Sequence, residues 1–198
     1  MSVKSTTPAV RSITAAVAAL WLAAGAAAEA GVITGSIPVS GAAEAERTVV
    51  YIESAPKTER SARRAKLSQK GTRFSPAVLP VVSGTNVDMT NNDWIAHSVF
   101  SKSEAKPFDL GIYSPGGVKT VEFEREGAVD VFCSIHPMMN SVVLVLQNPY
   151  FAKPDARGQF AIADIPAGTY TLKVYRLGGT ASAQQVNVPA AGSVTTSF

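Results

Sequence analysis

The stretch that decides the fold reads Ala128-Val-Asp-Val-Phe-Cys133-Ser-Ile-His136-Pro-Met-Met139. In its first half, apolar and polar residues alternate with the two-residue period of a β-strand, so that Val129, Val131 and Cys133 share one inward face. Its second half is a short loop in which a thiol, an imidazole and a thioether follow one another at intervals of three residues. The stretch therefore predicts a strand that ends at Cys133, followed by a tight loop that carries three possible metal donors.

The chain on both sides of this stretch has the same β character. From Gly31 onward, short runs rich in Val, Ile, Thr, Phe and Tyr alternate with clusters of Gly, Pro, Asn and Asp, as in an all-β sandwich or barrel. Helix-period segments are nearly absent, and by the strand period Val121 and Phe123 share a face. The predicted strands are Val32 to Ile37, Thr48 to Glu53, Val78 to Val82, Asn86 to Thr90, Ser98 to Ser101, Lys119 to Glu124, Ala128 to Cys133, Val142 to Leu146, Gln159 to Ala163, Thr169 to Tyr175, Ala183 to Val188 and Ser193 to Phe198.

The first thirty residues read as a signal peptide. Lys4 and Arg11 precede a short Ala-rich apolar run, and small residues follow it, which fits cleavage after Ala28 or Ala30. The run is short for a membrane span, and no later stretch is apolar for long enough to cross a bilayer. We therefore expect an exported protein of the periplasm without stable membrane insertion.

Composition narrows the possible functions. The chain has 18 basic and 15 acidic residues, a formal net charge of +3, which gives no reason to expect nucleic-acid binding. It has one cysteine, Cys133, so an internal disulfide is impossible and the thiol must be buried, reactive or ligated. It has two histidines, His97 and His136, which excludes any site that needs three.

The types of donor indicate copper. One thiolate and two imidazoles with a weak thioether are the set that suits a trigonal copper site with an axial Met, whereas zinc has little use for a thioether. Taken alone, each of these residues is more often ordinary packing or an ordinary loop residue. Together they predict one type 1 copper bound by His97, Cys133, His136 and Met139, in a site that a rigid sheet holds in place.

Other functions remain as alternatives. Cys133 activated by a histidine would be a catalytic nucleophile, but no third orienting residue or oxyanion-hole motif accompanies the pair, and the copper oxidases need further histidine-rich centres. We therefore expect an electron carrier and not an enzyme. Copper storage or delivery is the main alternative, and a further one makes the flanking strands a partner-binding module.

The segment from about Leu67 to Leu146 resembles the cupredoxins, and within them the amicyanin type with its Cys-x2-His-Pro-x-Met loop. The resemblance includes Phe74 to Leu79, Val82-x-Gly84-x-x-Val87 and Asn92-Asp93. It implies a Greek-key β-sandwich and a blue copper site with three in-plane ligands and an axial Met. Where the family usually has Asn after its first His ligand, this chain has Ser98, which we expect to bond toward Ser134.

The resemblance also implies how electrons enter and leave. His136 would be the portal at the surface, and redox partners such as periplasmic dehydrogenases or cytochromes would contact the apolar residues around it. The residues expected in this partner patch are Trp94, Ile95, Ile135, Pro137 and Met138. The same overall arrangement is similar to bacterial proteins of the methylamine-utilisation or plastocyanin-like type.

The two ends of the mature chain resemble the carboxypeptidase regulatory-like, transthyretin-like sandwiches. Gly158-x-Phe-x-Ile is followed by Pro166-x-Gly-x-Tyr-x-Leu, and residues 31–52 resemble the opening strands of that family. We therefore predict a second, small β-sandwich split by an inserted copper domain: a signal peptide over 1–30, first strands over 31–56, a basic linker over 57–66, the copper domain over 67–147 and the remaining strands over 148–198. The basic residues from Lys57 to Arg73 are expected to be a solvated linker, with a docking surface for an acidic partner as the alternative.

Overall fold

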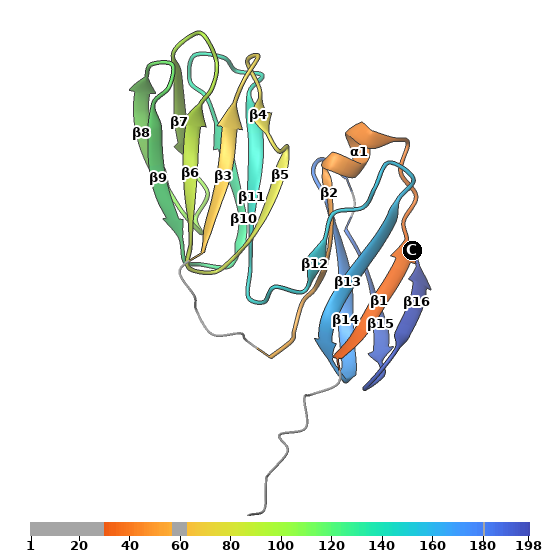
Figure 1. The fold of residues 1–198 in the computed structure, drawn as a ribbon. Coiled ribbons are helices and arrows are strands. Elements are labelled where there is room, and N and C mark those ends of the chain that lie inside the picture. The colour runs from red at the N-terminus through yellow and green to blue at the C-terminus, as the bar shows by residue number, and fades with distance from the viewer. Residues whose placement is uncertain (1–29, 57–62, 180) are drawn as a thin grey trace, which may run out of the picture.

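The computed structural model describes residues 30–56, 63–179 and 181–198. These residues form β-strands with one short helix, α1 (Ala42–Glu46), so the predicted all-β fold class is confirmed. The strands gather into two separate groups in Figure 1, one coloured yellow to cyan and the other orange and blue. Residues 1–29 of the predicted signal peptide lie outside the described residues, and Ala30 already begins the first strand. No helix within the described residues is long and apolar enough to span a bilayer.

The first sandwich contains the central part of the chain. One sheet has the order β4-β3-β6-β9 and the other β5-β11-β10-β7-β8. Between them lies a core that includes Leu67, Met89, Phe123, Val131 and Val143, all buried. The strands are β3 (Arg64–Gln69), β4 (Phe74–Ser75), β5 (Val78–Val82), β6 (Thr85–Asn91), β7 (His97–Ser101), β8 (Phe108–Tyr113), β9 (Val118–Phe123), β10 (Gly127–Phe132) and β11 (Asn140–Leu146).

The second sandwich combines strands from both ends of the described chain. Its sheets have the orders β13-β1-β16 and β12-β2-β14-β15, and its own core includes Ile33, Val50, Ile165 and Leu172. β1 pairs with β13 and β16, and β2 pairs with β12 and β14. This pairing is what a split sandwich requires, while the predicted domain boundaries remain a prediction. The strands are β1 (Ala30–Ser36), β2 (Thr48–Ile52), β12 (Phe151–Ala152), β13 (Gln159–Pro166), β14 (Gly168–Arg176), β15 (Ser182–Val188) and β16 (Ser193–Ser197).

The predicted facing of the central strands is correct. Val129 and Val131 are fully buried and Cys133 is 3% exposed, while the residues between them point outward. Val121 and Phe123 likewise face the core from β9.

The strand β3 was not among the predicted strands. The basic linker was expected to run to residue 66, but the strand begins at Arg64. Its alternation places Ala65 and Leu67 against the core and leaves the charged side chains outside, where Arg64 pairs with Asp88 at 2.6 Å. Charged residues on one face of a strand do not prevent pairing when the other face is buried. The rest of that linker, residues 57–62, lies outside the described residues.

Besides β3, the strands β4, β8 and β12 were not predicted from the sequence. β4 and β12 are two residues long, too short for a periodic signal. β8 is an edge strand that pairs with β7 through an irregular register, and Gly111 within it has a φ of 63°. A glycine in this conformation and a break in the register hide the alternation on which sequence reading depends.

The two sandwiches share a small apolar contact. Val49 from β2 packs with Val78, Leu144 and Leu146 from the first sandwich. Beside this cluster, the ammonium of Lys153 donates to the carbonyl oxygens of Glu46 and Val78, at 2.6 and 3.0 Å. The contact therefore combines apolar burial with hydrogen bonds from one half-buried cation.

Candidate metal centre

Two imidazoles and one thiol converge at one end of the first sandwich. Nδ1 of His97 lies 3.1 Å from Nδ1 of His136, and Sγ of Cys133 lies 3.9 Å from each of these nitrogens. All three donor atoms lie within 4.8 Å of one another. His97 and Cys133 are buried and His136 is half-buried, so the cluster opens toward solvent on the side of His136.

The sheet and one closed loop position these donors. His97 is the first residue of β7, and Cys133 directly follows the last residue of β10, the neighbouring strand in the sheet. The loop from Cys133 to Met139 closes on itself, because the Met139 N–H donates to the His136 carbonyl at 2.9 Å and the Cys133 N–H donates to the Met139 carbonyl at 3.3 Å. Met139 is 1% exposed and belongs to the same core cluster as Cys133. The backbone of the loop thus places Met139 beside Cys133.

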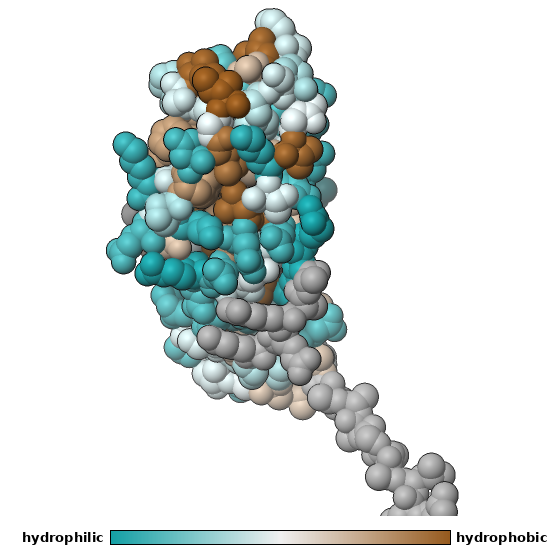
Figure 2. Space-filling view, turned by 90° about the vertical axis from the view of Figure 1, so that its left-hand side faces the viewer, coloured by the Kyte–Doolittle hydropathy of each residue, from teal (hydrophilic) through white to brown (hydrophobic). Residues whose placement is uncertain are grey.

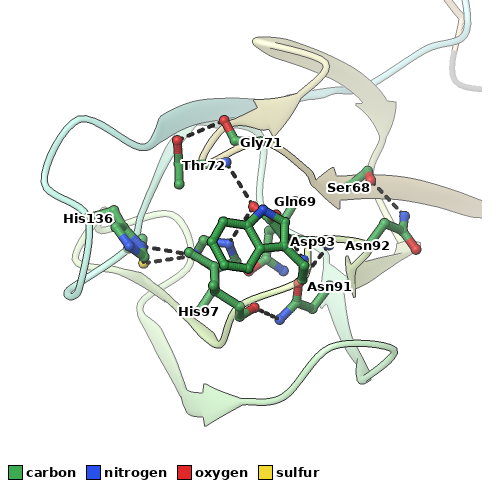
Figure 3. Close-up of polar contacts among 12 residues, drawn as sticks. Ser68, Gln69, Gly71, Thr72, Asn91, Asn92, Asp93, His97 and His136 are labelled. Atoms are coloured by element: carbon green, nitrogen blue, oxygen red, sulfur yellow. Dashed lines mark hydrogen bonds and ion pairs between the residues drawn. The ribbon is translucent and has the colours of Figure 1, made fainter.

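A buried carboxylate orients His97. Asp93 Oδ2 lies 2.9 Å from His97 Nε2 and also accepts the Thr72 N–H at 2.8 Å (Figure 3). The hydrogen bond from the Thr72 N–H has the largest effect on this carboxyl and the bond with His97 the next largest. Together they lower the pKa of Asp93 from 3.8 to about 2. A carboxylate acceptor keeps the proton of His97 on Nε2 and leaves the Nδ1 lone pair directed at the donor cluster.

Asp93 was not identified as a site residue from the sequence. Asn and Asp residues typical of a turn stand there, and Asn92-Asp93 entered only as part of the cupredoxin resemblance. The spacing of an acidic residue four positions before a candidate ligand was a further signal. In the structure this turn is held by Asn91, whose side-chain amide donates to the carbonyls of Ile95 and Tyr113 at 2.9 and 3.1 Å. The loop that presents Asp93 to His97 is therefore supported by two hydrogen bonds from the buried side chain of Asn91.

Two serines join the two ligand segments. Ser98 Oγ lies 2.7 Å from Ser134 Oγ and accepts the Ser134 N–H at 2.7 Å. The Ser98 hydroxyl also lies within donating distance of Cys133 Sγ, at 3.8 Å. The side chain of Ser98 thus contacts the backbone of the other donor-bearing loop.

The surroundings of Cys133 favour the thiolate. Burial by itself raises the pKa of the thiol, but backbone N–H groups of Ser98, His136 and Ile135 and the His136 side chain outweigh it, so that the pKa falls from 9.0 to about 6. The ionised sulfur is the form that binds metals. At neutral pH Cys133 can therefore act as an anionic ligand, and no strong base beside it is needed to remove its proton.

The residues predicted as a partner patch lie on the loops around these donors. Trp94 is 83% exposed, Met138 89% and Ile135 42%; Pro137 is exposed and Ile95 is half-buried. Figure 2 shows apolar side chains over the upper part of one face, with hydrophilic side chains prevailing below. The loops at the donor end thus present large apolar groups to solvent.

This donor set fits copper. A thiolate and two imidazole nitrogens are the in-plane ligands of a blue copper site. Nδ1 of His97 lies 3.1 Å from Nδ1 of His136, which is too close for two N–H groups that point at each other. The carboxylate of Asp93 accepts the hydrogen bond of His97 at the opposite nitrogen, Nε2. The converging lone pairs are thus arranged for a shared cation.

Comparison with known proteins gives matches to parts of the chain. The description "Polysaccharide lyase family 4, domain II" matches residues 132–197, about a third of the chain. No curated protein sequence matches.

Among solved structures, a purple cupredoxin from Nitrosopumilus maritimus is 27% identical, with 41% of this chain and 98% of that chain covered and a TM-score of 0.38. Amicyanin from Paracoccus versutus is 19% identical, with coverages of 48% and 96% and a TM-score of 0.39. A copper-containing nitrite reductase from Thermus scotoductus SA-01 is 20% identical, with coverages of 56% and 28% and a TM-score of 0.41. All three TM-scores are below 0.5, so the function proposed below rests on the side chains of this chain.

Proposed function

We propose that this protein is a one-electron carrier with one type 1 copper, which His97, Cys133, His136 and Met139 would hold. The observation that carries the proposal is the convergence of two imidazole Nδ1 atoms and one thiol Sγ within 4.8 Å, at the end of a rigid sheet. When bound, copper would supply the Cu(II)/Cu(I) couple. In this proposal the protein is not an enzyme.

The chain's own residues explain why such a site would exchange electrons rapidly. Asp93 and Ser98 hold the ligands from opposite sides through the hydrogen bonds described above. Ligands that hydrogen bonds hold in place before the metal binds change their positions little when the charge of the metal changes. His136, the half-buried member of the cluster, would be the route to the surface.

The test is the colour of the protein loaded with Cu(II). We expect an intense visible thiolate-to-copper absorption that disappears in Cys133→Ser. A colourless wild-type complex would refute the proposal.

A matched pair of methionine variants tests the axial ligand. Met139→Leu should change the visible spectrum and the reduction potential, because it removes the proposed thioether donor. Met138→Leu, one residue away and 89% exposed, is the control and should change neither. Equal spectra for both variants would assign the axial position to another group.

Storage or delivery of copper is separated from electron transfer by metal exchange. His97, Cys133 and Met139 are each at most 3% exposed, which favours a retained metal. We expect slow transfer of copper to a competing chelator or to an apo-acceptor, and rapid loss would favour delivery instead. We also propose, from the sequence of the first thirty residues, that the protein is exported to the periplasm, where its donors and acceptors would be dehydrogenases or cytochromes.

A further inference from the structure

The basic segment from Lys57 to Arg73 was predicted to be a linker, with a docking surface as the alternative. It includes β3 and ends beside the candidate metal centre. The strand register places its outward side chains in rows with those of β6 and β9. From the far end toward the donors, the rows are Arg64, Asn86 and Glu122; then Lys66, Asp88 and Thr120; then Ser68, Thr90 and Val118. The strand then enters the turn 70–73, which holds Lys70 and Arg73.

The charges in the first two rows cancel locally. Arg64 pairs with Asp88 at 2.6 Å, and Arg64 and Lys66 both lower the pKa of that carboxyl. Glu122 lies in the same row as Arg64. The two positive and two negative side chains of these rows therefore balance each other.

The end nearest the donors is different. We define the metal-end loops as residues 70–73, 92–96, 114–117 and 133–139. Their charged side chains are Lys70 and Arg73, both on exposed residues, and Asp93, which is 6% exposed and bonded to His97. The surface of these loops is thus cationic, with no exposed carboxylate of its own to balance it.

The backbone of the turn that carries the two cations is tied to the donors. Lys70 N–H donates to the Arg73 carbonyl at 3.0 Å, and Thr72 between them donates its N–H to Asp93 at 2.8 Å. Asp93 in turn bonds His97 (Figure 3). Two charged residues therefore lie in a turn that is one side chain, Asp93, away from a proposed copper ligand, and Asp93 is followed in the chain by the exposed Trp94.

Among the described residues, Glu46 of the second sandwich contacts the connection before β5. Glu46 Oε1 accepts the Ala77 N–H at 3.2 Å. Lys153, whose ammonium donates to the Glu46 carbonyl oxygen, lies beside it. Neither of these contacts involves a residue of the metal-end loops.

We propose that the metal-end loops dock a redox partner protein whose electron-exchange site is ringed by carboxylates, with Lys70 and Arg73 facing that ring and Trp94, Ile135 and Met138 forming the apolar centre. The inference rests on the proposed electron transfer. Opposite charges around an apolar contact steer encounter and fix orientation, while the apolar centre supplies contact area. A cationic rim selects acidic partners and disfavours basic ones.

The first test uses the metal-free protein, so that it is independent of copper binding. Hexacyanochromate(III), a redox-inert paramagnetic trianion, should broaden the backbone amide signals of residues 70–73 and 92–96 more than those of other regions. Lys70→Glu combined with Arg73→Glu should abolish this selective broadening. Broadening centred elsewhere on the wild-type protein would overturn the proposal.

The matched control reverses two cations at the other end of the same sandwich, Lys102→Glu with Lys106→Glu, which lie beyond the end of β7 away from His97. It changes the net charge by the same amount and should leave the broadening at residues 70–73 in place. A control that loses the broadening as fully as the test variant would show that total charge, and not the rim, is responsible.

The second test measures electron transfer from the reduced copper protein to hexacyanoferrate(III) and to tris(phenanthroline)cobalt(III), which have opposite charges. Raising the ionic strength from low to high should slow the first reaction by about ten-fold and speed the second. The rim variant should lose the first effect and the control should keep it. Rates independent of salt in a blue, redox-active protein would overturn the docking proposal alone, whereas a colourless protein would overturn the proposed function.

Discussion

Replacement of Ser98 by Ala tests how the two ligand segments are held together. Ser98 is 3% exposed, its Oγ accepts the Ser134 N–H at 2.7 Å, and it contacts the Ser134 hydroxyl at 2.7 Å. A net hydrogen bond contributes about 0.5–1.5 kcal/mol, so the loss of both should lower the free energy of unfolding by about 1–3 kcal/mol. For a chain of this length, that corresponds to a Tm lower by about 2–12 °C.

The assay is urea unfolding of the metal-free, reduced protein, followed by voltammetry of the copper-loaded form. Ser101→Ala is the matched control, because Ser101 lies on the same strand, is 4% exposed and accepts the Ser103 N–H at 3.1 Å. Both variants should be destabilised, Ser98→Ala more. Only Ser98→Ala should lower the reduction potential, since Ser98 also lies within donating distance of Cys133 Sγ.

Two results would refute this reasoning. If Ser98→Ala is no less stable than Ser101→Ala, the serine contact does not hold the ligand loop. If both variants keep the wild-type potential, the hydroxyl does not influence the sulfur.

Three further predictions concern other parts of the molecule. The pKa of Asp93 is lowered from 3.8 to about 2. The stability that its ionised form adds to the metal-free protein is therefore complete above pH 3.8 and is lost as the pH falls toward 2. In urea titrations, the difference in free energy of unfolding between wild type and Asp93→Asn should shrink over that range. Burial raises the pKa of Tyr113 from 10.0 to about 12, so the folded state resists ionisation and loses stability as the pH rises above 10; this loss should be smaller in Tyr113→Phe, measured against wild type at pH 8 and pH 11. Leu144→Ala, in the contact between the sandwiches, should lower the free energy of unfolding by about 2–5 kcal/mol, whereas Ile112→Ala at a 64% exposed position should change it by about 0.5 kcal/mol or less in the same denaturant titration.

Much of the fold follows from local pattern. Alternating apolar residues in β9 and β10 predicted which side chains face the core, and the structure agrees for Val121, Phe123, Val129 and Val131. The pattern did not predict β8, because an edge strand with Gly111 and an irregular register lacks a regular alternation. It did not predict β3 either, because charged residues on the outer face concealed a strand whose inner face is apolar.

The sequence by itself determined the chemistry that is available: one thiol and two imidazoles, so that any centre using all three has one cysteine and two histidine ligands. Residue types and short spacings carry that information without a fold. Only the tertiary structure decided which atoms of the histidines converge, that Asp93 lies behind His97, and that Lys70 and Arg73 lie beside the same loop. The physical reason is that these contacts join separate strands and turns, and their distances depend on how the sheets pair and pack, which no local pattern in the chain records.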